Sequence, residues 1–534
     1  MNVLMLYPKF PEETFWNTAR SIKLLWGRKA IMPPLGLLTI ANYLPEDFSL
    51  RLIDRNVSEE SSFDWEWADV IFLSVMMAQQ LDYKRCVSQA KIHGKPIVIG
   101  GPFTHAMPET ARNDADWVCF GEAENIIDPL ICDLRADRRG LHYEGGSDTN
   151  MEEVKVPRFE LLANLNDYAT MALQFSRGCP FKCEFCDIIE IYGRVPRTKT
   201  PRQICAELSA LERLGFQGYI FLIDDNFIGN KRKAKEMLAE LASWNAEHRH
   251  PFRYYTEASI NLADDEELLE RMARAGFFHV FIGIETSDPK LLQATQKMQN
   301  TTGDLLQKLA TIREHGLHVT GGFIIGFDGE AQSVFETQRK FIQASAIGLA
   351  MIGLLQAIPH TQLSRRLKAE GRLLERLSFT GNLTVEGINY IPQGEITKRD
   401  YLKSYGKLVQ ELYEPETYFA RILPGLLCLQ PRVPLIAVWR HGGKLTAILM
   451  KEFYQLGLRD EAIRSHFWKA FTQILWKNPA ALESFVFDTA VFHHLYQHAD
   501  HVQDEIGRYL LEPSPDDVLD RRVSRDAVAS TMEA

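Results

Sequence analysis

The first 135 residues alternate short, mainly apolar segments with amphipathic ones. The apolar segments are predicted strands, and they occupy residues 2–8, 50–57, 69–76, 96–102 and 115–124. Segments between them have the helical period, most clearly 33–44 and 80–93. Strands that are apolar throughout are typical of a parallel sheet with both faces buried, because a sheet with one wet face alternates apolar and polar positions. The pattern over 1–135 therefore predicts an α/β domain with a doubly wound parallel sheet.

A second series of strands with longer spacing follows a polar, glycine-containing stretch at 136–170, which we interpret as a linker with room for a short hairpin. Every gap in this series but the last holds a clear helix, and the predicted strands are 171–178, 218–226, 252–259, 277–285, 319–327 and 350–358. Six βα units predict a partial barrel over 171–375, a fold in which chemistry gathers on the loops that follow the strands. Residues 376–512 are predicted to be mostly helical, and the tail at 513–534 is predicted to be disordered.

Composition narrows the class of protein. The chain has 534 residues, of which 46% are hydrophobic, and its net charge of -10 indicates no nucleic-acid partner. The start, MNVLMLYP, lacks the regions of a signal peptide, and no apolar run is long enough to span a bilayer. Five of the eight cysteines stand alone, which argues against a disulfide framework and predicts a reducing, cytoplasmic location.

The other three cysteines lie close together in SRGCPFKCEFC, residues 176–186, directly after the first strand of the second series. Four thiolates normally fill the corners of a cubane iron–sulfur cluster, so the spacing Cys179-x3-Cys183-x2-Cys186 leaves one iron open. A zinc site is the alternative, but it needs a fourth ligand. No histidine lies nearby, and Cys205 follows only after a predicted helix start.

This spacing, with Phe185 before the last cysteine, resembles the radical S-adenosylmethionine (SAM) superfamily. The resemblance implies that Cys179, Cys183 and Cys186 bind a [4Fe-4S] cluster and serve the catalytic step. It also implies that the open iron binds SAM, and that one electron from the cluster cleaves SAM to methionine and a 5′-deoxyadenosyl radical. The electron would come from a donor such as ferredoxin or flavodoxin.

Residues at other strand ends match the superfamily's SAM-binding positions, among them those in IDDNFIGN, TEAS, GIETSD and GGFIIGFDGE. The resemblance implies SAM contacts from Phe185, Asp225, Asn226, Glu257, Glu285, Gly322 and Gly326. Structural alternatives remain open for most of them. Asn226 or Asn230 would cap the following helix, the two glutamates would be solvated or ion-paired, and the glycines would form a tight turn.

The preceding sheet resembles the cobalamin-binding domain of one radical SAM subgroup. The resemblance implies that cobalamin lies at the strand ends and contacts Tyr7, Met76, Gln79, Gly100, Gly101, Gly121 and Glu122. No G-x-G-x-x-G follows the first strand, so a standard dinucleotide site is not predicted. D-x-H-x-x-G is also absent, so either the cobalt has no protein histidine beneath it or the domain does not bind cobalamin. For His105, a surface position is favoured over a role as an unusual ligand.

Over nearly its whole length the sequence resembles the branch with a helical C-terminal extension, which includes hopanoid C-2 methylases and is close to bacteriochlorophyll-side-chain methylases. The motifs that carry this resemblance include MPPLGLLTIANYLP, RGCPFKCEFCDIIEIYGR, EASINLADD, FIGIET and LLQAIPHT. The implied reaction is methylation of an unactivated carbon in a hydrophobic small molecule, through a substrate radical and methylcobalamin.

Two alternatives to methylation stay open. The first is oxidative or ring-forming tetrapyrrole chemistry with the same cofactors, and the second is a non-catalytic sensor of cobalamin or redox state. The apolar segment 423–439 would hold a hydrophobic substrate, contact a membrane surface peripherally, or form part of a core.

Overall fold

The chain divides into two compact units in the computed structural model, which describes residues 1–12, 14–15, 17, 19–374, 388–393, 396–432 and 435–511. The first unit consists of Met1–Glu12, Ile22–Pro180 and Asp187–Thr256, and the second of Glu13–Ser21, Phe181–Cys186 and Glu257–Ala534. The tail at 513–534, predicted to be disordered, lies outside the described residues.

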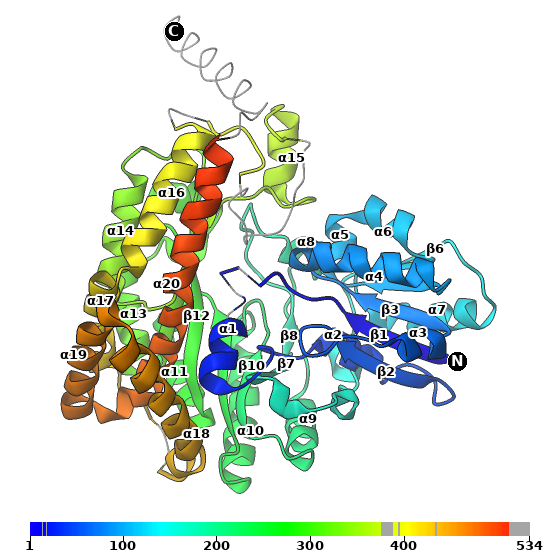
Figure 1. Ribbon diagram of the computed structural model, residues 1–534, viewed down its shortest axis with the longest axis horizontal. Helices are drawn as coiled ribbons and strands as arrows, with labels where there is room; N and C mark the ends of the chain where they lie inside the picture. The colour runs from blue at the N-terminus through cyan, green and yellow to red at the C-terminus, as the bar shows by residue number, and fades with distance from the viewer. Residues whose placement is uncertain are drawn as a thin grey trace, which may run out of the picture. The chain divides into compact units, whose positions relative to one another are not determined.

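The first unit holds a six-stranded parallel sheet in the order β2-β1-β3-β4-β5-β6 (Figure 1). Its strands are β1 (Asn2–Tyr7), β2 (Ser49–Asp54), β3 (Val70–Ser74), β4 (Ile97–Gly100), β5 (Trp117–Phe120) and β6 (Leu141–Glu144). Val3 and Met5 of β1 belong to one buried apolar cluster, whereas Leu4 and Leu6 belong to the other. Both faces of the sheet are therefore buried, and the predicted doubly wound sheet is confirmed.

Helices cover both faces of this sheet. Helices α2 (Leu35–Ile40) and α7 (Ile127–Arg135) supply side chains to the cluster on one face. The other face is covered by α3 (Ser62–Trp67), α4 (Gln80–Ile92), α5 (Pro102–Ala106) and α6 (Pro108–Asp114). This arrangement leaves the carboxyl ends of the strands as the edge at which α/β sheets bind ligands.

The stretch 136–170, interpreted above as a linker, contains the sixth strand of the sheet. β6 pairs parallel with β5, so the sheet continues to residue 144, past the expected domain end at 135. Only Tyr143 of this edge strand is buried, which is why LHYE lacks the apolar signature of the other strands. Three short 3-10 turns follow, at Met151–Glu153, Phe159–Leu161 and Leu165–Asp167.

The second parallel sheet has the strand order β14-β13-β12-β11-β10-β7. Its strands are β7 (Thr170–Leu173), β10 (Gly218–Leu222), β11 (Phe252–Ala258), β12 (Phe277–Glu285), β13 (His318–Ile325) and β14 (Ala350–Leu354). All six predicted strands are confirmed, and so is the partial barrel of βα units. The first of them is interrupted, because β8 (Ser176–Arg177) leaves the sheet and pairs antiparallel with β9 (Arg197–Thr198).

Helices alternate with these strands. They are α9 (Pro201–Arg213), α10 (Lys231–Glu247), α11 (Glu266–Ala275), α12 (Pro289–Ala294), α13 (Leu305–Glu314) and α14 (Val334–Ser345). Capping fixes several of their starts: the side chain of Thr200 accepts a hydrogen bond from the backbone of Gln203, and that of Asp265 accepts one from Leu268. Helix α14 occupies the last gap, where no clear helix was expected.

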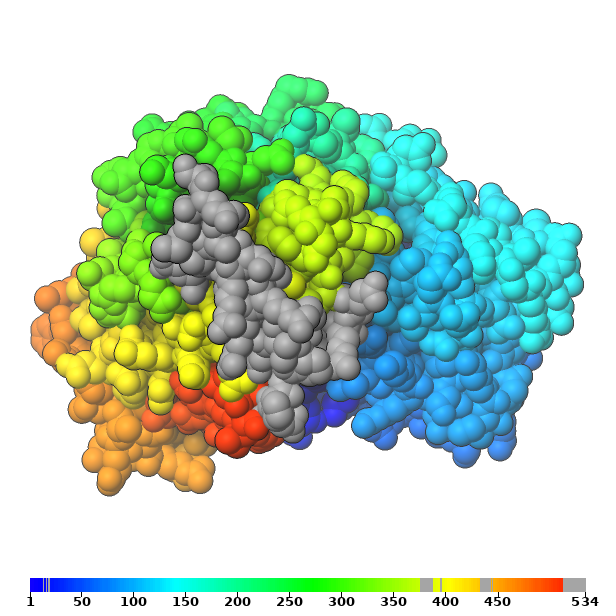
Figure 2. All heavy atoms as spheres, turned by 90° about the horizontal axis from the view of Figure 1, so that it is seen from above, coloured from blue at the N-terminus to red at the C-terminus, as the bar shows by residue number. Residues whose placement is uncertain are grey.

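The chain beyond the second sheet is helical, starting with α15 (Gln362–Ala369), which lies before the predicted helical region at 376–512. Within that region lie α16 (Lys398–Tyr413), α17 (Pro415–Cys428), α18 (Leu435–Tyr454), α19 (Glu461–Lys477) and α20 (Leu482–Leu511). Helices α16 and α20 lie side by side (Figure 1), and the yellow-green segment that holds α15 lies at the surface of the second unit (Figure 2). Helix α16 is joined to β14 by hydrogen bonds from the Tyr405 and Tyr413 hydroxyls to the carbonyls of Ile352 and Ala350, at 3.0 and 2.6 Å. Among the described residues, no helix has both the length and the hydropathy that a membrane crossing requires.

Candidate functional site

The cysteine loop lies between β8 and α8 (Ile188–Ile191). Cys183 is buried, whereas Cys179 and Cys186 are partly exposed, and all eight cysteines of the chain lie in its described part with none in a disulfide. Hydrogen bonds hold the loop backbone: Cys179 N–H donates to the carbonyl of Gly193 at 3.2 Å, and Cys186 N–H to that of Cys183 at 3.2 Å. Three thiols are therefore presented on one short, ordered loop.

Two side-chain amides point at sulfur atoms of this loop. Asn226 Nδ2 donates to Cys179 Sγ at 3.8 Å within the first unit, and Gln299 Nε2 donates to Cys183 Sγ at 3.6 Å within the second. Donors of this kind stabilise negative sulfur, which is how a protein adjusts an iron–sulfur cluster. The donor set fits the cluster that the sequence implies.

Among the described residues, no group of three or more His, Cys, Asp or Glu side chains is arranged to hold one metal ion. Each cysteine of a cubane cluster binds a different iron, so the cysteine loop does not need such an arrangement.

The acidic pair after β10 is the next feature of the first unit. The Asp224 carboxylate is buried and accepts hydrogen bonds from the backbone of Phe175, at 3.2 Å, and from Ser176. Burial raises the pKa of Asp224 to about 6. Burial, followed by the charges of Asp224 and Asp187, raises the pKa of Asp225 to about 7. A cationic group placed beside Asp225 would relieve this repulsion.

Two contacts show whether Asn226 or Asn230 caps α10. Asn230 Oδ1 accepts a hydrogen bond from the backbone of Lys233 at 3.2 Å, which makes it the N-cap. Asn226 instead points its amide at Cys179. Asn230 is therefore the cap of α10, and the Asn226 amide donates to the cysteine loop.

The end of β12 is held by a buried ion pair. Glu285 has a φ of +65°, and its Oε1 atom accepts a hydrogen bond from Lys297 Nζ at 2.6 Å. Burial acts against the ammonium, but Glu285 and Cys183 raise the pKa of Lys297 above its ordinary value. Asn300 Nδ2 donates to the carbonyls of Gly283 and Ile284, each at 3.0 Å. Glu285 is thus ion-paired, which was one of the two structural alternatives left open for it.

The remaining residues expected to contact SAM lie on or just after strands. Phe185 packs against Phe327, with ring centroids 5.8 Å apart, which brings the cysteine loop beside the segment that follows β13. Gly326 directly follows that strand, and its carbonyl accepts a hydrogen bond from the Tyr390 hydroxyl. Gly322 lies inside β13, and the half-buried Glu257 is the next-to-last residue of β11.

The cysteine loop is also bonded to the chain beyond the second sheet. Glu184, between two of the cysteines, accepts a hydrogen bond from Arg366 Nε of α15 at 2.5 Å. Its backbone carbonyl accepts one from Leu363 N–H at 3.0 Å, and its N–H donates to the carbonyl of Thr295 at 3.0 Å. This part of the loop is therefore held on both sides within the second unit.

The order of the first sheet reverses between β1 and β3, and parallel α/β sheets bind ligands at such a switch point. Tyr7 ends β1, and its hydroxyl donates to Met76 Sδ at 3.6 Å across the switch. Gln79 is fully buried, donates to the carbonyl of Pro8 at 2.5 Å and accepts from the backbone of Met76 at 2.8 Å. Burial, together with the Asp54 charge, raises the pKa of Tyr7 above its ordinary value.

Close backbone contacts explain the glycines of this edge. Gly101, after Gly100 at the end of β4, has a φ of +93°, and a Cβ there would lie 2.8 Å from the carbonyl oxygen of Val75. Gly121 has a φ of +72°, and a Cβ there would lie 2.5 Å from the carbonyl oxygen of Gly146. A side chain fits neither position, so these turns bring bare backbone to the ligand edge of the sheet. Two turns without side chains fit the close approach of a bulky ligand such as a cobalamin tail.

Glu122 differs from the other residues expected to contact cobalamin. Its carboxylate is buried and accepts hydrogen bonds from Arg177, Arg197 and the backbone of Thr149. These contacts are all within the protein.

Known families match the chain in three successive parts. A B12 binding domain matches residues 27–131, the radical SAM superfamily matches 173–341, and a domain of unknown function matches 361–508. An uncharacterized methyltransferase of Synechocystis sp. is 38% identical over 100% of this chain and 99% of its own length. The hopanoid C-2 methylase of Rhodopseudomonas palustris is 32% identical over 93% of both chains. The chain belongs to the cobalamin-dependent radical SAM methyltransferase family. SAM, a [4Fe-4S] cluster and cobalamin are the cofactors of this family, and the chain is an enzyme.

A solved structure supports the fold of this family member. The radical SAM methyltransferase TsrM of Kitasatospora setae, with cobalamin and a [4Fe-4S] cluster bound, superposes with a TM-score of 0.61 at 15% identity, over 85% of this chain and 99% of that chain. More distant relatives include a bacteriochlorophyllide d C-12(1)-methyltransferase of Chlorobaculum tepidum, 24% identical over 64% of this chain and 74% of its own length. An anaerobic magnesium-protoporphyrin IX monomethyl ester cyclase of Cereibacter sphaeroides is also 24% identical, over 56% of this chain and 53% of its own length.

Sequence reasoning missed two residues of the second unit that lie beside the loop. Lys297 and Gln299 belong to KMQN at 297–300, which has no recognisable motif and sits 114 or more positions from Cys183. The one signal that could have indicated Lys297 was Glu285, because a carboxylate buried away from water needs a cationic partner.

Proposed function

We propose that this protein transfers a methyl group to an unactivated carbon of a hydrophobic small molecule, as a cobalamin-dependent radical SAM C-methyltransferase. The observation that carries the proposal is the three-cysteine loop on a partial barrel in a chain that also has a cobalamin-type sheet. Similarity over 93% of the chain to a methylase that acts on hopanoids supports carbon methylation. The cofactors, when bound, supply a hydrogen-abstracting radical and a transferable methyl group.

In this proposal the first sheet binds cobalamin, the partial barrel over about 171–375 binds the cluster and SAM, and the helical region from 376 to 512 contributes to substrate binding. Cys179, Cys183 and Cys186 hold the cluster, while the amides of Asn226 and Gln299 donate to their sulfur atoms.

The expected SAM contacts are Phe185, Asp225, Asn226, Glu257, Glu285, Gly322 and Gly326. Among these, Asp225 is suited to the SAM amino group because its raised pKa makes a cationic partner favourable. Glu285 acts together with Lys297, whose ammonium lies 2.6 Å from its carboxylate. Phe185 packs against Phe327, the residue after Gly326, and we propose that the segment following β13 contacts the adenine of SAM.

The expected cobalamin contacts are Tyr7, Met76, Gln79, Gly100, Gly101 and Gly121. Gln79 holds the turn after β3 in place, and Tyr7 and Met76 line the switch point. Glu122 was expected here too, but its carboxylate is engaged by Arg177 and Arg197, so its effect on cobalamin would be indirect.

A hydrophobic methyl acceptor suits the helical region. Large apolar side chains are exposed on α18, on α19 and between them, namely Met450, Tyr454, Leu458, Leu475 and Trp476. These side chains provide a surface for an apolar substrate or for peripheral contact with the membrane that holds such a substrate. We place the enzyme in the cytoplasm, where thiols stay reduced, with ferredoxin or flavodoxin as electron donor.

A second function, ring-forming tetrapyrrole chemistry with the same cofactors, is favoured by the similarity to the anaerobic cyclase. That similarity covers 56% of the chain, against 93% for the hopanoid methylase, so methylation is the first choice. A cofactor sensor is not favoured, because the cysteine motif is complete.

The test is anaerobic purification with added cobalamin, followed by iron, sulfide and cobalt analysis of one sample. About four irons and about one cobalt per chain are expected. The loaded enzyme is then given SAM, a reductant and candidate apolar acceptors, with Cys183→Ala as control. Methyl transfer produces S-adenosylhomocysteine as well as 5′-deoxyadenosine, because a second SAM restores the methyl donor. Turnover that gives 5′-deoxyadenosine and altered substrate without S-adenosylhomocysteine would refute methylation in favour of the cyclase-type reaction.

A further inference from the structure

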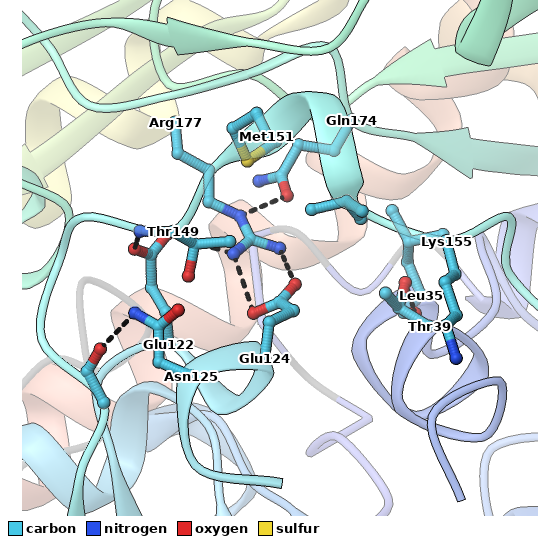
Figure 3. A network of polar contacts seen from close by, with 12 residues as sticks. Leu35, Thr39, Glu122, Glu124, Asn125, Thr149, Met151, Lys155, Gln174 and Arg177 are labelled. Carbon is cyan, nitrogen blue, oxygen red and sulfur yellow. Dashed lines mark hydrogen bonds and ion pairs between the residues drawn. The ribbon is translucent and has the colours of Figure 1, made fainter. Parts of the chain in front are cut away.

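Four charged residues form a buried network inside the first unit, and Figure 3 shows three of them, Arg177, Glu122 and Glu124. Arg177 donates to Glu122 at 3.0 Å and binds both oxygens of Glu124, at 2.6 and 3.0 Å. Arg197 donates to both oxygens of Glu122, at 3.1 and 2.8 Å. The side chains of Glu122 and Glu124 are 0% and 7% exposed, and those of Arg177 and Arg197 are 11% and 17% exposed.

The geometry of Arg177 is that of a fixed fork rather than a loose ion pair. Its Nε atom donates to the side chain of Gln174 at 2.8 Å, while its two terminal nitrogens reach Glu122 and Glu124. Bidentate guanidinium–carboxylate pairs fix orientation as well as charge, and a lysine cannot reproduce them. Burial acts against the charge of Arg177, but Glu124 raises its pKa above the ordinary value. The two arginines balance the two glutamates.

The members of the network come from two parts of the fold, the turn after β5 and the strands β8 and β9. The proposed reaction requires these two parts to be held at a fixed distance. Glu122 and Glu124 follow β5, at the carboxyl edge of the cobalamin-type sheet. Arg177 lies in β8, two positions before Cys179, and Arg197 lies opposite it in β9. The two strands that lead into and out of the cysteine loop are therefore both bonded to one turn of the sheet.

Further bonds make this turn rigid. Glu122 N–H donates to the carbonyl of Gly146 at 3.1 Å, and its carboxylate accepts from the backbone of Thr149 at 2.9 Å. Arg197 also donates to the carbonyls of Thr149 and Tyr192, at 2.9 and 3.0 Å. A displacement of β8 would therefore have to break several hydrogen bonds of buried charged groups together, which is unfavourable.

We propose that Arg177 is a positioning residue: through Glu122 and Glu124 it sets the place of Cys179, and hence of the cluster, relative to the cobalamin edge of the sheet. The inference rests on the proposed function, because it gives the network a purpose only if both cofactors are bound. It also explains why Glu122, expected from sequence to contact cobalamin, turns its carboxylate inward.

The test measures the magnetic coupling between the reduced cluster and cob(II)alamin by pulsed electron paramagnetic resonance in the fully loaded, substrate-free enzyme. This coupling decreases steeply with the distance between the two centres, so it reports placement without turnover. The variants are Arg177→Met, Arg177→Lys and Glu124→Gln. Arg158→Met is the matched control, because Arg158 pairs with Glu160 at the surface of the same unit.

We expect Arg177→Met to keep its iron and cobalt but to show a weaker coupling with a broader spread of distances. Arg177→Lys should show a smaller change of the same kind, and Arg158→Met none. If Arg177→Met does not fold, the result is read from Arg177→Lys and Glu124→Gln, which keep the size of each side chain. An unchanged coupling at full loading would overturn the inference, and so would loss of cobalamin alone, since Arg177 would then act in binding. Wild-type enzyme without cobalt would refute the proposed function itself, which separates the two failures.

Discussion

Replacing Lys297 by methionine tests how the end of β12 is held beside the cysteine loop. Lys297 Nζ lies 2.6 Å from Glu285 Oε1, and the two side chains are 11% and 9% exposed. Methionine keeps the length of the side chain but leaves the carboxylate of Glu285 buried without its cation. Removing one partner of a buried pair costs about 3–5 kcal/mol. We expect about 3 kcal/mol, the lower end of that range, because both side chains keep some contact with solvent.

Hydrogen–deuterium exchange of the cofactor-free chain is the suitable assay, because a chain of two units does not unfold in one step. A loss of about 3 kcal/mol corresponds to roughly hundredfold faster exchange at the amides of β12 and of residues 297–300. Lys290→Met is the matched control: Lys290 is exposed on α12, and its replacement should change local stability by less than about 0.5 kcal/mol.

The double variant Lys297→Met with Glu285→Gln removes the buried charge as well. It should recover much of the protection, because an amide is cheaper to bury than a carboxylate. Exchange in Lys297→Met within about tenfold of wild type would refute the reasoning, since that corresponds to only about 1.4 kcal/mol. A double variant that exchanges as fast as the single one would refute it too.

Three further predictions concern the loop and the segment after β13. Cys179→Ala, Cys183→Ala and Cys186→Ala should each abolish reductive SAM cleavage without unfolding the protein, and 5′-deoxyadenosine formation by any of them would contradict the cluster assignment. Gln299→Leu removes a donor to Cys183, so redox titration should give a more negative cluster potential; an unchanged potential would contradict that contact. Burial raises the pKa of Glu330 from 4.5 to about 7, so the folded state holds this proton more tightly than the unfolded chain. Stability should therefore fall by up to about 3 kcal/mol as pH rises from about 5 to 8. Glu330→Gln should remove that part of the pH dependence when local stability is followed by hydrogen–deuterium exchange corrected for intrinsic rates, and identical pH profiles would argue against it.

The regular part of the fold could be predicted because it is encoded locally. β1 and β12 are mainly apolar along their whole length, so the burial of both faces can be inferred from the sequence itself. β6 was missed because an edge strand buries few side chains, so the sequence LHYE has the pattern of a linker. Helix α14 was missed because SVFETQRKFIQAS mixes polar and apolar residues without a strong boundary signal.

The candidate site was predictable only as far as its motif. The cysteine spacing indicates a cluster because three ligands lie within one loop. The side chains that surround these ligands belong to segments far away in the sequence. Gln299 approaches Cys183 across 116 positions, and Arg177 reaches Glu122 across 55. Such pairings depend on how strands assemble, so they cannot be predicted from the spacing of residues within one segment. Likewise, either Asn226 or Asn230 satisfies the cap pattern, and only the three-dimensional course of the loop separates their roles.

The bonds from α15 to the cysteine loop bear on how this enzyme can be engineered. Arg366 and Leu363 lie in the segment matched by the domain of unknown function, yet both donate to Glu184 between the cluster cysteines. A chimera that joins this barrel to another relative's C-terminal region would replace the donors that hold Glu184. Exchange of the whole C-terminal region would therefore also change how the cysteine loop is held, whereas point substitutions in α16–α20 would leave these two bonds in place.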